Sequence, residues 1–465
     1  MEKKRGKILV AGAGKSGLAS AELLLDHAKE VVLYDGNADL NEADIRAKSK
    51  KLSRVPMIFG ELDENKMEQF EIAVLSPGIP TDSGVVEALK RHGVKIWGEV
   101  ELAFRYAKGH VIAVTGTNGK TTTTALLGEI LKRHFSDVQV AGNIGIAYTS
   151  VAAKTKEETK IALEVSSFQL ETIIDFCPDV SVILNITPDH LNRHHTMENY
   201  IEAKKSVTKN QKPGQTCVLN YEDPILRRFG ESLKLDVIYF SSKTKLKRGL
   251  YLDADAIYFA DTGFKDGAKK VVDVKDMKLL GVHNYENAMA AAAAAFAVGV
   301  PLQKIAEALK AFQAVEHRIE YVAEVSGVAY YNDSKATNPD AAIKGILAME
   351  RPTYLIGGGY DKQSEYGEWI DAIKAFPYGV KKLVLIGETK EKIAQSAKER
   401  GFGAVALCDT LKEAVEYCHR CALPKEAVLL SPACASWDSF PNYEKRGETF
   451  KEIVRGFQEK EMKMK

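Results

Sequence analysis

Short apolar runs alternate along this chain with amphipathic stretches of helical period. The first strand-like run, KILVAGAG, precedes a helix expected from about 16 to 27 and a second strand, EVVLYD. The same order returns at HVIAVTGTNGKTTTTALLGEILKRHF, and again from VAYYND through PTYLIGGG and KKLVLIG to AVLLSPAC. Because parallel strands need crossover connections, strands that alternate with helices are typical of parallel sheets. The pattern therefore predicts an α/β protein built from three such segments.

The length of the chain agrees with three segments. Its 465 residues suit about three domains at roughly 150 residues each. We place the domains at 1–98, 99–314 and 315–465. Within the second, the region 246–277, rich in Asp and Tyr, is expected at a sheet edge, and the alanine-rich stretch 287–300 is expected as a buried helix.

Bulk charge gives no sign of a polyanionic partner, since 64 Lys and Arg residues balance 63 Asp and Glu residues. We therefore expect no nucleic-acid and no membrane partner. The first apolar run is short for a signal peptide, and no stretch approaches the ~18 apolar residues of a membrane helix. A cytoplasmic protein with reduced cysteines is expected. Cys418 and Cys421 form a lone C-x-x-C, for which two buried thiols on one helix face are the ordinary alternative to a metal or redox role.

The first glycine motif combines Gly12, Gly14 and Gly17 with Asp35 at the end of the next strand. This spacing between strand and helix is typical of dinucleotide binding. Its physical content is narrower: backbone N–H groups at a helix N-terminus face a diphosphate, and a carboxylate accepts from the sugar or base. A nicotinamide cofactor, another nucleoside diphosphate and a purely structural turn all remain open from these residues.

The second glycine motif, Gly116 to Thr121, is two residues shorter than the usual P-loop. A helix dipole favours an anion by only ~0.3–1 kcal/mol at exposed sites and up to ~2 kcal/mol when partly buried. Binding of a triphosphate therefore needs further electrostatic stabilisation, which Lys120 and a divalent ion on the Thr121 hydroxyl would supply.

Two metal-binding side chain types follow neighbouring strands of this segment. Glu164 is the last residue of the strand-like run IALE, and His190 comes just after the strand-like run VILNIT. The carboxyl ends of parallel strands meet at one edge of a sheet, so both side chains should converge on the phosphate turn. Taken alone, Glu164 or His190 could equally be a surface side chain whose hydrogen bonds are made to its neighbours or to water. Together they predict a metal-assisted phosphoryl-transfer site.

These motifs, taken in order, resemble those of the Mur ligases, ATP-dependent amide-bond formers of peptidoglycan assembly. The resemblance spans almost the whole chain and is carried by GTNGKTT, EVSSFQLE, NITPDHLNRH, YIEAK, GVHNYENA, EHRIE, NDSKATNP and LLSPACASWDSF. With GAGKSGLA and SPGIP, it is strongest to the member that adds D-glutamate to UDP-N-acetylmuramoyl-L-alanine. It implies a UDP-binding Rossmann-like domain, a central P-loop-type ATPase domain and a mobile Rossmann-like amino-acid domain. The first glycine motif would then hold a UDP diphosphate, with no nicotinamide or flavin.

The resemblance also implies roles for individual residues. The catalytic set is Lys120, Glu164, His190 and Lys204. The implied magnesium ligands, for two sites, are Thr121, Glu164, His190 and Lys204 as a carbamate. The implied ATP contacts are Gly116, Asn118, Gly119, Lys120, Thr121, Thr122, Asn284, Asn287, Arg318 and Asp333.

The two remaining substrates have their own implied contacts. Those to the UDP-substrate are Lys15, Ser16, Asp35, Gly78, Asn143 and His190. Those to D-glutamate are Lys335, Thr337, Lys362, Ser436 and Tyr443. Tyr443 stands where the family often has phenylalanine, and Trp437 where it often has leucine, which leaves the shape of this pocket open.

The implied reaction uses ATP as cosubstrate and passes through an acyl phosphate, which the D-glutamate amine then attacks. A monomer is expected. Three other functions remain as alternatives: a related ligase that adds glutamate to folate, an NAD-dependent oxidoreductase, and a nucleotide-binding regulator without catalysis.

Overall fold

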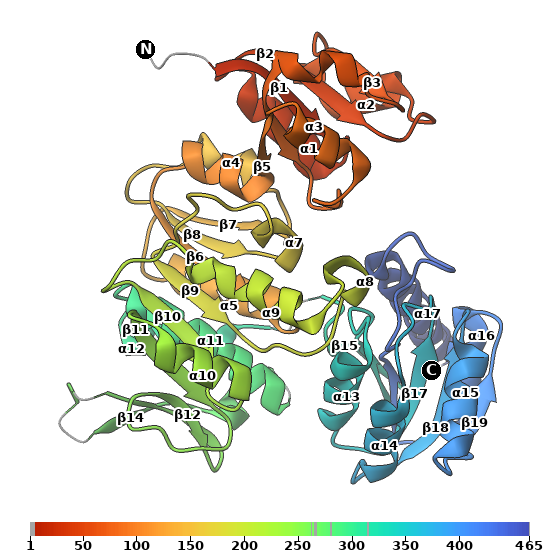
Figure 1. Ribbon diagram of the computed structural model, residues 1–465. Coiled ribbons are helices and arrows are strands. Elements are labelled where there is room, and N and C mark those ends of the chain that lie inside the picture. The colour runs from red at the N-terminus through yellow and green to blue at the C-terminus, as the bar shows by residue number, and fades with distance from the viewer. Residues whose placement is uncertain (1–4, 262, 265–266, 280, 314–315, 465) are drawn as a thin grey trace. The chain divides into compact units, whose positions relative to one another are not determined.

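The computed structural model describes residues 5–261, 263–264, 267–279, 281–313 and 316–464 (Figure 1). The chain divides into two compact units. The first comprises Met1–Val274 and Glu286–Lys310, and the second comprises Lys275–Tyr285 and Ala311–Lys465.

The first unit opens with a five-stranded parallel sheet in the order β3-β2-β1-β4-β5. Its strands are β1 (Arg5–Ala11), β2 (Ala28–Asp35), β3 (Met57–Phe59), β4 (Phe70–Leu75) and β5 (Lys95–Gly98). Its helices are α1 (Lys15–Leu24), α2 (Glu42–Lys48), α3 (Gly84–Arg91) and α4 (Glu99–Tyr106), with 3-10 turns at Lys50–Leu52 and Glu64–Gln69. Alternate residues of β1 enter two different cores, Ile8 and Val10 on one face and Leu9 and Ala11 on the other. Both faces are therefore covered, as expected for a parallel sheet.

A nine-stranded sheet forms the rest of the first unit, in the order β14-β13-β12-β11-β10-β9-β6-β8-β7. The strands are β6 (His110–Thr115), β7 (Val138–Gly142), β8 (Lys160–Glu164), β9 (Val180–Ile183), β10 (Thr216–Asn220), β11 (Asp236–Ser241), β12 (Gly249–Asp253), β13 (Ala256–Ala260) and β14 (Ala268–Asp273). Pairing is parallel from β7 to β12 and antiparallel from β12 to β14. Strand β6 lies between β8 and β9, so the loops after these three strands are neighbours.

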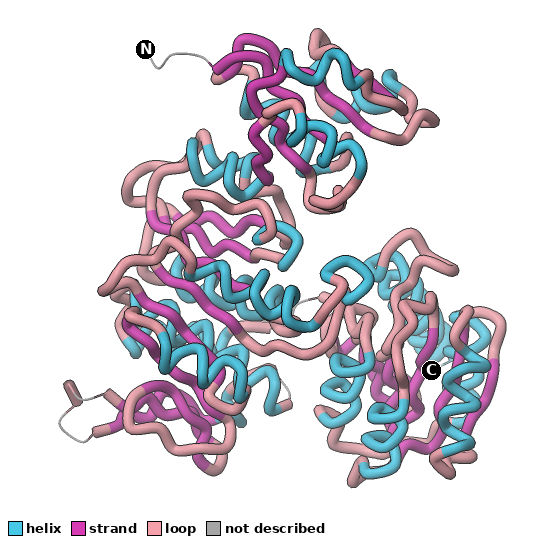
Figure 2. Tube along the Cα trace, in the orientation of Figure 1, coloured by secondary structure: helices cyan, strands magenta, loops and turns pink. Residues whose placement is uncertain are grey.

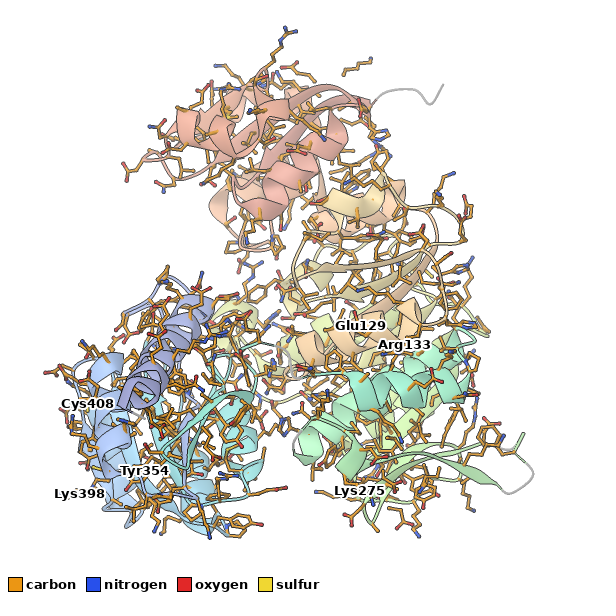
Figure 3. The ribbon with its side chains drawn as sticks, turned by 180° about the vertical axis from the view of Figure 1, so that it is seen from behind. Glu129, Arg133, Lys275, Tyr354, Lys398 and Cys408 are labelled. Carbon is orange, nitrogen blue, oxygen red and sulfur yellow. The ribbon has the colours of Figure 1, made fainter. Side chains whose placement is uncertain are left out.

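Helices pack on both faces of this sheet. The helices of this segment are α5 (Lys120–Lys132), α6 (Thr149–Ala152), α7 (Ser167–Leu170), α8 (Leu191–His194), α9 (Met197–Lys205), α10 (Pro224–Ser232), α11 (Val282–Ala297) and α12 (Leu302–Ala311), with 3-10 turns at Ser206–Thr208 and Val274–Asp276. Figure 3 looks onto the face covered by α5, where Glu129 and Arg133 are labelled. Helices α9 and α10 lie on the opposite face (Figure 1). Residues 288–295 of α11, seven alanines and Met289, are buried.

The second unit is built on a six-stranded sheet in the order β15-β16-β20-β17-β18-β19, in which only the β15–β16 pair among the described pairs is antiparallel. The strands are β15 (Glu320–Val325), β16 (Val328–Asn332), β17 (Thr353–Gly358), β18 (Val380–Ile386), β19 (Val405–Leu407) and β20 (Ala427–Leu430). The helices are α13 (Pro339–Leu347), α14 (Gly367–Ala375), α15 (Lys390–Glu399), α16 (Leu411–Cys421) and α17 (Tyr443–Met464). One core takes residues from α13, α14 and α15, and the other from α16 and α17. The sheet is thus layered between helices (Figure 2).

The expected α/β class with three parallel-sheet domains is confirmed. The domain limits at 98 and 314 stay predictions, and residue 314 lies outside the described residues. Strands β12, β13 and β14, within the region 246–277, lie at one end of the nine-stranded sheet, as expected for a sheet edge. The C-x-x-C expectation is wrong in part, because Cys418 is buried but Cys421 is exposed.

No helix among the described residues is long and apolar enough to cross a membrane.

Candidate active site

The short glycine turn connects β6 to α5. Gly116 and Gly119 have φ of 143° and 90°, values that glycine adopts without strain. Space is also restricted, since a Cβ would lie 2.9 Å from Leu184 Cβ at Gly116 and 2.2 Å from Asn287 Oδ1 at Gly119. Lys120 is the first residue of α5. The N-terminus of α5 therefore borders the turn, in the arrangement that binds phosphate.

Two lysines meet at one carbonyl of this turn. Lys120 Nζ donates to Gly116 O at 2.9 Å and to Thr117 O at 2.8 Å. Lys204 Nζ, from α9, donates to the same Gly116 O at 2.8 Å. The Lys204 side chain is buried, and this burial, with a smaller contribution from the Lys120 charge, holds the pKa of Lys204 well below its ordinary value; Asp189 opposes the shift. The structure thus brings these two predicted residues together.

Glu164 lies beside the same turn, because it ends β8 and pairs with Val114 of β6. Its Oε1 accepts from Asn143 Nδ2 at 2.8 Å. Its Oε2 is buried and has no hydrogen-bond partner within the described part of the chain. A buried carboxylate oxygen without a donor fits a hard cation such as Mg²⁺, which prefers oxygen ligands.

His190 belongs to the loop after β9. It precedes α8 with φ of 54°, and its ring meets Phe168 of α7 at 4.9 Å between centroids. The loops after β8 and β9 are therefore in contact. Within the described ranges, no group of three or more His, Cys, Asp or Glu side chains is arranged to hold a metal ion. The expected ligand set includes only two such residues, Glu164 and His190, with Thr121 and a modified Lys204 as the others.

Two residues that the sequence analysis missed hold the turn in place. Asn185 Oδ1 accepts from Asn118 N at 2.8 Å, and Asn185 Nδ2 donates to Asn118 O at 3.0 Å. Tyr200 OH lies 3.0 Å from Thr117 Oγ1, and its ring lies 4.5 Å from Lys204 Nζ. Both were detectable, because Asn185 belongs to NITPDH and Tyr200 is one helical turn before Lys204.

The N-terminal glycine turn gathers four of the predicted UDP contacts at one sheet edge. Lys15 and Ser16 begin α1, Asp35 ends β2, and Gly78 lies in the loop after β4. Asp35 Oδ2 accepts from Ala13 N at 2.8 Å, so this carboxylate holds the turn itself. Asn143 lies instead beside Glu164 in the central sheet.

Two of the predicted ATP contacts, Arg318 and Asp333, lie in the second unit, and Asp333 directly follows β16. Asp333 is buried and accepts from Ser431 Oγ at 2.8 Å. Burial raises the pKa of Asp333 to about 7, while the Ser431 hydrogen bond and the Arg318 charge oppose this rise. Arg318 Nε is buried without a described partner. Asn284 is buried in this unit, whereas Asn287 belongs to the first unit.

Two of the predicted amino-acid contacts are lysines that lie over aromatic rings. Lys335 Nζ lies 5.1 Å from the centre of the Tyr443 ring, and Lys362 Nζ lies 5.4 Å from that of Trp437. Ser436 is buried, and its Oγ has no hydrogen-bond partner in the described part of the unit. Thr337 is half-buried, and its backbone N–H donates to Lys335 O.

Arg446, which the sequence analysis missed, joins the loops that carry these groups. Its buried guanidinium donates to Ser334 O at 2.8 Å and to Cys434 O at 3.1 Å. The loop after β16 is thereby attached to the loop after β20. No local pattern marks this residue, because it lies in an ordinary stretch of α17.

A phosphate-binding turn with two converging lysines, set in a central sheet and accompanied by two further parallel-sheet domains, defines an α/β nucleotide-dependent enzyme. Three family descriptions match the chain: "Mur ligase MurD-like, N-terminal domain" at residues 6–98, "Mur ligase middle domain" at 114–295, and "Mur ligase, glutamate ligase domain" at 317–434. The chain belongs to the Mur ligase family.

Relatives agree over nearly the full length. The chain is 50% identical over 454 residues to the UDP-N-acetylmuramoylalanine--D-glutamate ligase of Lachnoclostridium phytofermentans, covering 97% of this chain and 98% of that one. It is 48% identical to the enzyme of the same name from Lachnospira eligens, covering 98% and 99%. Among solved structures, UDP-N-acetylmuramate-alanine ligase MurC from Thermotoga maritima has a TM-score of 0.62 at 19% identity, covering 97% of this chain and 99% of that one. MurF ligase from the same organism, in complex with ADP, has a TM-score of 0.59 at 16% identity, covering 98% and 96%. These two structures support the fold.

Proposed function

We propose that this chain is an ATP-dependent, ADP-forming ligase that adds D-glutamate to UDP-N-acetylmuramoyl-L-alanine in peptidoglycan precursor biosynthesis. The observation that carries the proposal is the convergence of Lys120 and Lys204 on Gly116 O, in a turn bordered by the buried carboxylate of Glu164. The names of the relatives supply the substrates.

The chemistry requires activation of a carboxylate. A free carboxylate is a poor acyl donor because it would have to expel oxide. The L-alanyl carboxylate therefore attacks the γ-phosphate of ATP, forming an acyl phosphate and releasing ADP. The glycine turn and the N-terminus of α5 hold the phosphates, while Lys120 neutralises charge that develops during the transfer. The contribution of the protein is positioning and electrostatics.

Thr121, Glu164, His190 and Lys204 would hold magnesium at up to two sites, where bound cations neutralise phosphate charge. The buried Lys204 fits this set only after modification, since an ammonium repels a cation. Its lowered pKa favours the neutral amine, which can add carbon dioxide to give a carbamate and release one proton. The carbamate oxygens are ligands of the hard type that magnesium prefers.

The amino-acid site completes the reaction. We assign the two carboxylates of D-glutamate to the cluster of Lys335, Thr337, Lys362, Ser436 and Tyr443. Lysine ammonium groups and a free hydroxyl are suitable donors for carboxylates, and Ser436 Oγ has no other described partner. The D-glutamate amine attacks the acyl-phosphate carbon, a tetrahedral intermediate forms, and phosphate leaves as the amide bond is completed. A monomeric state and a cytoplasmic location stay predictions.

The test is ADP release from the purified chain with ATP, Mg²⁺ and UDP-N-acetylmuramoyl-L-alanine, comparing D-Glu, L-Glu, L-Lys and D-Ala. Sustained ADP release should require D-Glu. Turnover with a folate acceptor in place of the UDP-substrate would identify the related folate ligase instead. ATP binding without phosphate release, when both acceptors are present, would indicate a nucleotide-binding regulator, and nicotinamide-dependent turnover an oxidoreductase.

A further inference from the structure

A cluster centred on Arg193 lies outside the residues assigned above. Arg193 belongs to α8, the one-turn helix directly after His190. Its Nη2 donates to Glu171 Oε2 at 2.7 Å, and its Nε donates to Glu171 Oε1 at 3.3 Å. Only 11% of the Arg193 side chain and 14% of the Glu171 side chain are exposed. A bidentate, largely buried pair of this kind has a fixed geometry.

The same guanidinium reaches the N-terminal sheet. Arg193 Nη2 also donates to the backbone oxygen of Ile79 at 3.0 Å. Ile79 follows Gly78 in the loop after β4, and Gly78 is one of the proposed contacts to the UDP-substrate. Both ends of this hydrogen bond lie in the first unit of the chain.

A third contact directs Arg193 toward the reaction centre. Its guanidinium lies 5.0 Å from the centre of the Phe168 ring. The ring of His190 meets the same phenylalanine edge-on at 4.9 Å. Arg193 therefore contacts the loop after β4, and it packs on the aromatic ring that supports His190.

We propose that Arg193 is a positioning residue that sets the UDP-substrate loop at residues 77–82 relative to His190 and the phosphate turn. The inference rests on the proposed function, because it assumes that the UDP-substrate is held by the N-terminal sheet and reacts at the central one. An acceptor bound in this way must place its carboxylate at the γ-phosphate. A misplacement of about 1 Å between binding groups and a reacting centre costs roughly 100-fold in rate.

A second interaction joins the loop at residues 77–82 to the segment around α8, and it serves as a matched control. His195 Nε2 lies 2.9 Å from Asp82 Oδ2, but these side chains are 63% and 60% exposed. An exposed pair is screened by water and salt, so it should contribute little. His195→Ala removes this link two residues away from Arg193 and should leave the kinetics of the enzyme within 2-fold.

The test compares Arg193→Met, Arg193→Lys and Glu171→Gln with His195→Ala. Arg193→Met should lower kcat/KM for the UDP-substrate by about 100-fold, while the Kd for ATP, measured by calorimetry, changes less than about 2-fold. Arg193→Lys should have a kcat/KM between those of Arg193→Met and the wild type. Lysine keeps the charge but lacks the planar guanidinium that donates to Glu171 and to Ile79 O at the same time. Glu171→Gln should act in the same direction with a smaller effect.

Two results would overturn the inference. One is unchanged kcat/KM for the UDP-substrate in a folded Arg193→Met chain. The other is an equal loss of ATP affinity, which would mean a general structural role. Should Arg193→Met not fold, Glu171→Gln decides by the same criteria. A wild-type chain that is inactive with the UDP-substrate would instead refute the proposed function, so the two failures are distinguishable.

Discussion

Burial shifts the pKa values of two site residues in opposite directions. The pKa of Asp333 is raised to about 7, and the pKa of Lys204 is lowered, because burial disfavours the charged form of each. Both residues were predicted from motifs, but their burial was not, since it depends on residues far away in sequence, such as Gly116 and Ser431. Arg446 was missed for a related reason, because its partner Ser334 is set by the fold.

Asp333 should make the second unit less stable as pH rises. An acid with a raised folded-state pKa binds its proton more tightly when folded, so stability is lost between about pH 4 and pH 7, at about 1.4 kcal/mol for each pKa unit. Asp333→Asn removes this titration and keeps an oxygen to accept from Ser431 Oγ. Thermal unfolding without ligands should give similar midpoints for the two chains at pH 4 and a higher midpoint for the variant at pH 8. A midpoint difference independent of pH would contradict the assignment.

At the scale of elements, alternation of apolar residues and glycine spacing predicted strands in all three sheets and both glycine turns. Central sheet strands β10 and β11 were not anticipated, because each is a brief apolar run beside polar loops. Helix α9, which carries the YIEAK motif, ends at Lys205 and continues only as a 3-10 turn. Local pattern cannot mark such an end, since the helical residues on either side of it are similar.

The turn between β1 and α1 gives a prediction with an internal control. A Cβ at Gly17 would lie 1.7 Å from the backbone oxygen of Gly12, whereas a Cβ at Gly14 meets nothing within 4 Å. Gly17→Ala must push α1 away from β1, so it should lower the free energy of unfolding by about 1–3 kcal/mol. Gly14→Ala, with φ of −80°, should stay within about 0.5 kcal/mol. Chemical denaturation of both chains measures the difference, and equal stability would refute the close approach.

At the scale of the molecule, the order of the motifs along the chain was enough to predict three α/β domains. The arrangement within each sheet required the structure. Strand β6 is central because β8 and β9 pair on either side of it, and only this order places Glu164 and the His190 loop beside the phosphate turn. Pairing between distant strands is not written in any local window of sequence.

Substrate binding and phosphoryl chemistry should be separable, because four of the six proposed UDP-substrate contacts lie on the N-terminal sheet, whereas Lys120 lies on the central one. Lys120→Ala should leave the Kd for the UDP-substrate within about 2-fold of the wild-type value. Phosphate release should fall by at least about 100-fold, as charge stabilisation in the transition state is lost. Calorimetry and a phosphate-release assay measure the two quantities. Loss of UDP-substrate affinity together with phosphate release would contradict this separation of binding and chemistry.

The oxygen that receives both lysines belongs to the main chain, so no point substitution can delete it. Exchange of either lysine leaves the acceptor intact and available to the other amine. Effects of single replacements at positions 120 and 204 will therefore not add up to the effect of changing both, as is usual for groups that share a partner. Only a complete double-mutant cycle can measure how strongly the two amines depend on each other.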